Sequence, residues 1–62
     1  MYQQIILEAT GCSKADLRQI EEVMRDVHPT MDHLTKRQLN KLAREAWEAV
    51  KELRLEGIYE TP

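Results

Sequence analysis

The strongest constraint on the fold comes from residues 36–56, which lie in the longest stretch of the sequence without glycine or proline. Ala, Leu, Glu, Lys and Arg dominate this segment, and all five residue types favour helices. Its apolar residues recur every three or four positions, which places them on one face of an α-helix. The segment therefore predicts a long amphipathic helix that ends before Gly57 and needs other elements to cover its apolar face. This apolar stripe consists of Leu39, Leu42, Ala43, Ala46, Val50 and Leu53.

Two shorter helices are predicted in the N-terminal half of the chain. Residues 2–9 carry a short apolar run that fits a strand or a helix, and the lack of a second strand to pair with favours a helix. Gly11 suits the left-handed residue that follows a helix end. Residues 14–27 form the second helix, because Pro29 disfavours helical structure at His28. The apolar face of this helix consists of Leu17, Ile20, Val23, Met24 and Val27.

The expected architecture is an all-α, three-helix bundle in which two shorter helices pack on the long C-terminal helix. Residues 1–62 form a single domain, and residues 57–62 form a tail that is either docked or frayed. A domain of this size buries only about 60% of the surface of its unfolded chain. The single cysteine cannot form an internal disulfide, so stability has to come from helix packing, self-association or a partner.

The sequences that precede the second and third helices share one pattern, which predicts both helix starts. Ser13 and Thr35 occupy the N-cap position, where a hydroxyl accepts a hydrogen bond from a free backbone N–H group. Asp16 and Gln38 lie three residues further on and complete a capping box at each start. Hydrophobic staples are expected between Cys12 and Leu17 and between Leu34 and Leu39.

Residues 10–21 (TGCSKADLRQIE) resemble the turn and the start of the recognition helix in helix-turn-helix regulators. The resemblance implies a DNA-binding transcriptional regulator that reads DNA through Lys14, Arg18 and Gln19. The chain departs from that family at Leu7, where a small residue is usual, and its first helix is short. The second helix also has a surplus of carboxylates, which repel the phosphates that supply most nucleic-acid affinity. Capping alone explains the spacing, so DNA binding is the alternative function.

A longer part of the chain, residues 9–50, is similar to uncharacterised small helical proteins of bacteria and their phages. The similarity lies in the stretches ATGC, IEEVMRD and LTKRQLNKLAREAWEAV. It implies a bacterial or phage origin and brings no known active residues. By analogy with small phage proteins that disable a host protein, we expect a non-enzymatic protein–protein interaction module, encoded by a phage or another mobile element.

One flank of the long helix concentrates positive charge beside Trp47, when residues are placed at about 100° intervals. Glutamates occupy the opposite flank. The helix dipole disfavours cations in a first turn by about 0.3–1 kcal/mol each, so stability does not explain Lys36 and Arg37. The basic flank suits an acidic protein surface or a phosphate backbone, and we predict that it binds an acidic surface of a protein partner. The predicted binding residues are Lys36, Arg37, Arg44, Trp47, Lys51 and Arg54.

Two other interpretations of the long helix are open. One is an ordinary solvated face, stabilised weakly by pairs of Lys41 with Glu45 and of Arg44 with Glu48. The other is a homodimer, in which a second copy covers whatever part of the broad apolar face the shorter helices leave free. Apolar residues at positions 39, 42, 46, 49 and 53 follow the spacing of a coiled-coil seam.

The sequence carries no signature of an enzyme. Cys12, His28, Asp32 and His33 lack the paired spacing of metal-binding motifs, and a packed Cys12 thiol is expected to be inert. No catalytic residue, metal or cofactor is therefore predicted. No apolar run approaches the roughly 20 residues of a membrane span, and no signal peptide is visible. With one cysteine and no export signal, we expect a cytoplasmic protein that does not contact membranes. The net charge of −2 argues against general binding of nucleic acids and leaves a local basic patch possible.

Overall fold

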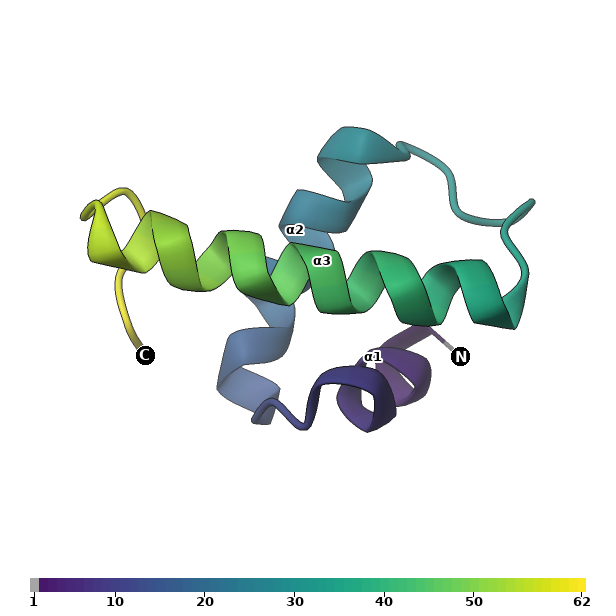
Figure 1. Ribbon diagram of the computed structural model, residues 1–62, viewed down its shortest axis with the longest axis horizontal. Coiled ribbons are helices and arrows are strands. Elements are labelled where there is room, and N and C mark those ends of the chain that lie inside the picture. The colour runs from purple at the N-terminus through teal and green to yellow at the C-terminus, as the bar shows by residue number, and fades with distance from the viewer. Residues whose placement is uncertain (1) are drawn as a thin grey trace.

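The computed structural model describes residues 2–62 and contains three helices: α1 (Tyr2–Thr10), α2 (Lys14–Val27) and α3 (Lys36–Leu55) (Figure 1). The prediction of an all-α fold with two shorter helices on a long C-terminal helix is confirmed. The observed bounds differ from the predicted ones by one residue, at the end of α1 and at the end of α3. No strand occurs in the described part of the chain.

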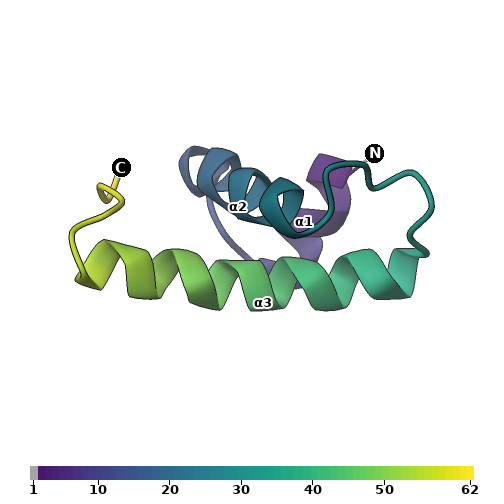
Figure 2. The ribbon, with the colours of Figure 1, turned by 90° about the horizontal axis from the view of Figure 1, so that it is seen from above.

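The three helices form two layers, with α3 alone in one layer and α1 and α2 together in the other (Figure 2). The helix α2 crosses α3 near its middle, whereas α1 lies toward the N-terminal end of α3 (Figure 1). Both shorter helices contact α3 more extensively than they contact each other. Because α1 and α2 lie on the same side of α3, neither of them covers the opposite face of α3 (Figure 2).

The core forms where the two shorter helices meet the apolar stripe of α3. Its position agrees with the predicted stripe, because Leu42 and Leu53 are half-buried and the other four stripe residues are fully buried. Val27 was predicted to face the core and is instead 60% exposed. Val27 is the last residue of α2, and this end of α2 extends beyond the crossing with α3 (Figure 1). The buried residues are Ile6, Leu17, Ile20, Met24, Met31, Leu39, Ala43, Ala46 and Val50.

Both predicted capping boxes are present. At the start of α2, the Asp16 amide donates to Ser13 Oγ at 3.3 Å and the Ser13 amide donates to Asp16 Oδ2 at 3.0 Å. At the start of α3, the Gln38 amide donates to Thr35 Oγ1 at 3.1 Å and the Thr35 amide donates to Gln38 Oε1 at 2.9 Å. Each box satisfies backbone donors that a helix start leaves without partners, and such a cap contributes about 0.5–2 kcal/mol.

Glycines end α1 and α3, as the sequence predicts. Gly11 has a φ angle of 67° and Gly57 has a φ angle of 80°, a left-handed conformation that glycine adopts without steric cost. After α3, the amide of Ile58 donates to the carbonyl of Leu53 at 2.9 Å. This bond, two residues beyond the cap, is typical of a Schellman motif, and it turns the chain back at the end of the long helix.

The tail that follows α3 is docked against α2. The side-chain amide of Gln19 donates to the carbonyl of Glu60 at 2.9 Å, and Tyr59 packs against the core. Burial raises the pKa of the Tyr59 hydroxyl, and the nearby charges of Glu22 and Asp26 raise it further. The choice between a docked and a frayed tail, which the sequence left open, is therefore decided by contacts with α2.

The loop between α2 and α3 is anchored by Met31, which is buried although it lies outside every helix. A second anchor is the hydroxyl of Tyr2, which donates to Asp32 at 2.7 Å. This hydrogen bond raises the pKa of the Tyr2 hydroxyl. Through this hydrogen bond, the loop that precedes α3 also contacts the start of α1.

Candidate functional site

The N-terminal half of α3 presents positive charge that the chain does not neutralise by ion pairing. Lys36, Arg37, Lys41 and Arg44 are all exposed, and the first turn of α3 contains no acidic residue. Three ion pairs occur among residues 2–62, and none of them includes any of these four side chains. Since the helix dipole disfavours cations in the first turn of a helix, Lys36 and Arg37 do not stabilise the start of α3. Their charges are available to a negatively charged partner.

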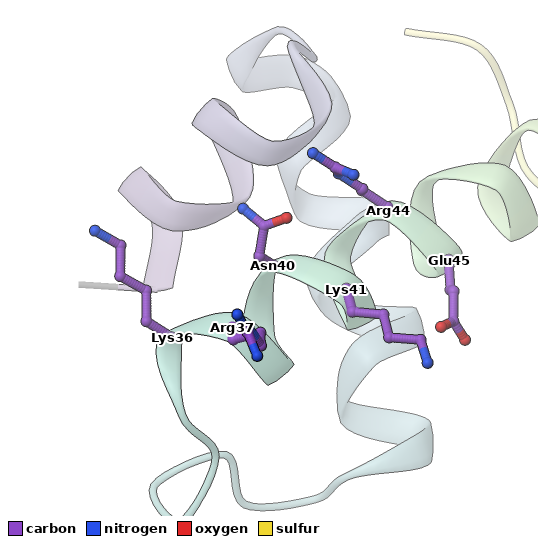
Figure 3. A pocket seen from close by; sticks show the side chains of 6 residues that line it. All are labelled: Lys36, Arg37, Asn40, Lys41, Arg44 and Glu45. Carbon is purple, nitrogen blue, oxygen red and sulfur yellow. The ribbon is translucent and has the colours of Figure 1, made fainter.

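The same four cations contribute to the walls of a shallow groove along the surface of α3, which we call the α3 groove (Figure 3). Residues four apart in sequence lie one above the other on a helix, so each wall is a row of every fourth residue. Asn40 and Arg44 point toward the side of α3 on which α1 lies, whereas Lys41 and Glu45 point away from it (Figure 3). The wall nearer α1 consists of Lys36, Asn40 and Arg44, and the other wall consists of Arg37, Lys41 and Glu45.

Glutamates on α3 do not neutralise this groove. The pairs that the sequence suggested, Lys41 with Glu45 and Arg44 with Glu48, are both absent from the ion pairs of the described residues. Glu48 pairs instead with Lys51, with 2.6 Å between Nζ and Oε2. The expectation of those two stabilising pairs is therefore wrong, and the cations of the α3 groove are left without them.

Trp47, one of the predicted binding residues, is half-buried and packs against the core. The Nζ atom of Lys51 lies 5.2 Å from the centroid of its ring, and the guanidinium carbon of Arg54 lies 5.4 Å from it. Both distances are within the range of cation–π attraction. Lys51 and Arg54 thus each interact with the ring of Trp47.

Arg54 is held by α2. Its guanidinium donates to Asp16 Oδ1 at 2.8 Å and to the side-chain oxygen of Gln19 at 2.9 Å. The side chains of Arg54 and Asp16 are only 12% and 16% exposed. The hydrogen bond from Arg54, assisted by one from the backbone of Ser13, lowers the pKa of the Asp16 carboxyl below its ordinary value. Because Arg54 attaches α3 to α2, we do not include it in the candidate binding surface.

The predicted basic flank therefore divides into two parts. In its N-terminal part, Lys36, Arg37 and Arg44 come together in the α3 groove with Lys41, which was not among the predicted binding residues. In its C-terminal part, the remaining predicted residues are engaged within the chain. The helical repeat of about 100° per residue places all of the predicted residues on one side of α3. It does not indicate which of them have partners elsewhere in the chain.

The residues of the alternative DNA-binding surface do not form one group. Lys14 and Arg18 line a second shallow hollow beside α1, together with Glu21, which forms an ion pair with Arg25. Gln19 lies on another flank of α2, where both ends of its side-chain amide are hydrogen-bonded, to Arg54 and to the tail. A base-reading role would require Gln19 to give up these two hydrogen bonds.

Cys12, His28 and His33 occupy the connections between helices. Cys12 is a partly buried free thiol that packs against the core. The rings of His28 and His33 meet edge to face, with their centroids 6.0 Å apart. Across residues 2–62, no three His, Cys, Asp or Glu side chains come together in a way that could hold a metal ion. None of α1, α2 and α3 is long and apolar enough to span a membrane.

Comparisons of the chain with protein-family models, with curated proteins and with solved structures found no match. The site is therefore interpreted from its own geometry. That geometry defines a small helical domain whose long helix carries a groove with four exposed cations and one carboxylate.

Proposed function

We propose that this protein is a small, non-enzymatic interaction module that binds an acidic surface of a protein partner through the α3 groove. The observation that carries the proposal is the set of four exposed cations without ion pairs, Lys36, Arg37, Lys41 and Arg44. They lie within one helix segment of a chain whose net charge is −2. Partner carboxylates placed between the two walls would gain charge-assisted hydrogen bonds and would be steered toward the groove during association.

A protein partner is favoured over a nucleic acid by the charges around the groove. Glu45, Glu48 and Glu52 are exposed on the same helix, immediately beyond the cations, and they would repel a phosphate backbone that extends along α3. The alternative surface on α2 includes exposed Glu22 and Asp26. An acidic patch of limited extent on a protein fits four clustered cations better than a long polyanion does.

The setting of this interaction is proposed from the resemblance to small proteins of bacteria and their phages. We place the protein in the cytoplasm and propose that its partner is a host protein, bound by a product of a phage or another mobile element. Binding without catalysis is consistent with a site made of a shallow groove on a single helix, because enzymes usually need a deeper concave pocket.

The proposal is tested by capture of partners from a bacterial lysate at low and high salt, followed by mass spectrometry. We expect that wild-type protein retains one or a few acidic proteins at low salt and releases them at high salt. The variant Arg37→Glu/Arg44→Glu should lose them. The variant Lys14→Glu/Arg18→Glu, which reverses the same number of charges on α2, should retain them.

Two outcomes would contradict the proposed function. If the α3 variant captures the same proteins as the wild type, the groove is not the binding surface. If a gel-shift assay finds tight, salt-sensitive binding to duplex DNA that Lys14→Glu/Arg18→Glu abolishes, the helix-turn-helix alternative replaces the proposal. Circular dichroism of each variant, compared with the wild type, verifies that the helices are intact.

A further inference from the structure

The shape of the α3 groove carries information about its partner beyond charge. Its two walls are adjacent rows of residues spaced four apart, one through Lys36 and Arg44 and the other through Arg37 and Lys41. Such rows are the ridges that helices use when they pack against each other, and the space between two of them accepts one ridge of a second helix. One wall of the groove, with Asn40 and Arg44, lies on the side of α3 nearer α1, whereas Lys41 and Glu45 on the other wall point away from α1 (Figure 3).

We infer that the element bound by this groove is an acidic α-helix of the partner protein, with carboxylates at every fourth position on the ridge that enters the groove. This inference rests on the proposed function and specifies the partner's structure. Packing of a ridge of this kind between the two walls sets the crossing angle of the helices at about −50°. Carboxylates four residues apart repeat about every 6 Å along a helix, which is the spacing of Arg37 and Lys41 on one wall, and every second carboxylate matches the spacing of about 12 Å between Lys36 and Arg44 on the other wall.

An extended acidic peptide fits this surface less well than a helix. Extended peptides gain much of their affinity by adding a strand to the edge of a sheet, through main-chain hydrogen bonds. Residues 2–62 contain no strand, and the backbone amide of Gln38 at the start of α3 is already capped by Thr35. Side chains are therefore the main source of contacts in the groove, and a helix presents side chains at the matching spacing.

A second copy of this chain is also a poorer occupant. The seam that would drive a coiled-coil dimer is used within the chain, because Leu39 and Ala46 are buried in the core and Leu42 packs against it. The exposed face of α3 carries charges in place of that seam. Self-association through the groove would have to rest on exposed ion pairs, which contribute little individually.

Because of Glu45, we expect the groove to prefer an acidic helix that carries one positive charge beside this residue. Glu45 is the only carboxylate among the six lining residues and lies at the C-terminal end of its wall. A partner ridge made only of carboxylates would be repelled at that end, whereas a ridge with one lysine or arginine there would form an additional pair. The variant Glu45→Gln should therefore bind a purely acidic helix more tightly than the wild type does.

Two synthetic peptides of about 20 residues test the inference, a length at which a helix is stable enough to be populated alone. Both have the same composition, with glutamates at every fourth position on an alanine-rich background. In the helical peptide two prolines precede the first turn, and in the matched peptide they interrupt the centre. Binding is measured by fluorescence anisotropy at low and moderate salt. We expect the helical peptide to bind wild-type protein about tenfold more tightly than the matched peptide.

Variants of the protein test whether the helical peptide binds in the α3 groove. Arg37→Glu/Lys41→Glu should weaken binding of the helical peptide by about tenfold or more, and Arg37→Gln/Lys41→Gln should weaken it less. Lys14→Glu/Arg18→Glu, the matched control, should bind as the wild type does. Equal binding by the Arg37→Glu/Lys41→Glu variant would overturn the inference, because the peptide would then lie elsewhere.

The remaining outcomes separate this inference from the proposed function. If both peptides bind equally well, the helical partner is ruled out while an acidic partner stands. If neither binds at low salt, the inference is overturned, and the lysate experiment decides independently whether the groove binds proteins. A DNA duplex that binds the wild type more tightly than the helical peptide would also overturn it, in favour of a nucleic acid.

Discussion

The guanidinium of Arg54, near the end of α3, donates a 2.8 Å hydrogen bond to the carboxylate of Asp16, in the first turn of α2. The same carboxylate accepts hydrogen bonds from the amide and the hydroxyl of Ser13, at 3.0 and 2.8 Å. One side chain therefore both starts α2 and attaches it to α3. The attachment also withdraws Arg54 from the basic flank and leaves the exposed positive charge at the opposite end of α3.

Replacement of Asp16 should reduce stability more than loss of an ordinary cap residue. Asp16→Ala removes the capping interaction and leaves Arg54 largely buried without its charged partner, which together should lower the free energy of unfolding by about 2–4 kcal/mol. Gln38→Ala removes the equivalent capping residue of α3, which has no ion pair, and should cost about 1 kcal/mol. Urea denaturation measures both values. Equal losses in the two variants would show that the Arg54 contact contributes nothing.

The Asp16–Arg54 pair should make stability dependent on pH in the acid range. The folded-state pKa of Asp16 is lowered, so its contribution is fully present above the unfolded-state pKa of about 3.9. It is lost as the pH falls through the lowered folded-state pKa. Unfolding in urea, measured from about pH 6 to about pH 2, should therefore show a steeper loss of stability for the wild type than for Arg54→Met. Parallel pH profiles for the two proteins would contradict the assignment.

Reversal of a cation in the α3 groove should stabilise the isolated domain while impairing binding. Arg37 lies in the first turn of α3, where the helix dipole favours an acid, so Arg37→Glu should raise the free energy of unfolding by about 0.3–1 kcal/mol. Arg25→Glu provides the control, because it places an acid in the last turn of α2 and breaks the ion pair with Glu21; it should be destabilising. Thermal denaturation at low salt compares them. A destabilising Arg37→Glu would mean that the cation serves folding, which would weaken its assignment to a partner.

The attachment of α1 should depend on a single side chain. Ile6 is the one buried residue of α1, so Ile6→Ala should lower the free energy of unfolding by about 2–5 kcal/mol. Ile5 is only partly buried, and Ile5→Ala should cost clearly less. Because a domain this small is marginally stable, both are best measured by urea unfolding at about 10–20 °C, near the maximum of stability. Similar costs at the two positions would indicate that α1 has no defined buried face.

Helix positions and helix ends were accessible from the sequence because the interactions that set them are local. Ser13 with Asp16 and Thr35 with Gln38 act across three residues, and Gly11 and Gly57 end helices through their own backbone freedom. The apolar stripe of α3 could also be predicted from the sequence, since a repeat of three and four residues identifies the buried face before the covering helices are known.

The burial of Val27 and Met31 could not be predicted from the sequence, because it depends on where the helices cross and on the path of the loop between α2 and α3. Val27 satisfies the apolar repeat of α2, yet it lies past the crossing with α3 and is exposed. Met31 belongs to no repeat, yet the loop carries it into the core. Neither outcome has a signal within a few residues of the position concerned.

In the candidate site, too, some features follow from the local sequence and others depend on the packing of the helices. The one-sided distribution of cations along α3 follows from the helical repeat, so it could be read from residues 36–56 alone. The sequence could not show which of these cations lack an ion pair, because Arg54 pairs with Asp16 at a separation of 38 residues. Arg37 and Arg44, in contrast, are exposed and belong to none of the ion pairs of the described residues. Periodicity places a charge on a helix face, and only the packing of the other helices determines whether that charge is paired within the chain or left for a partner.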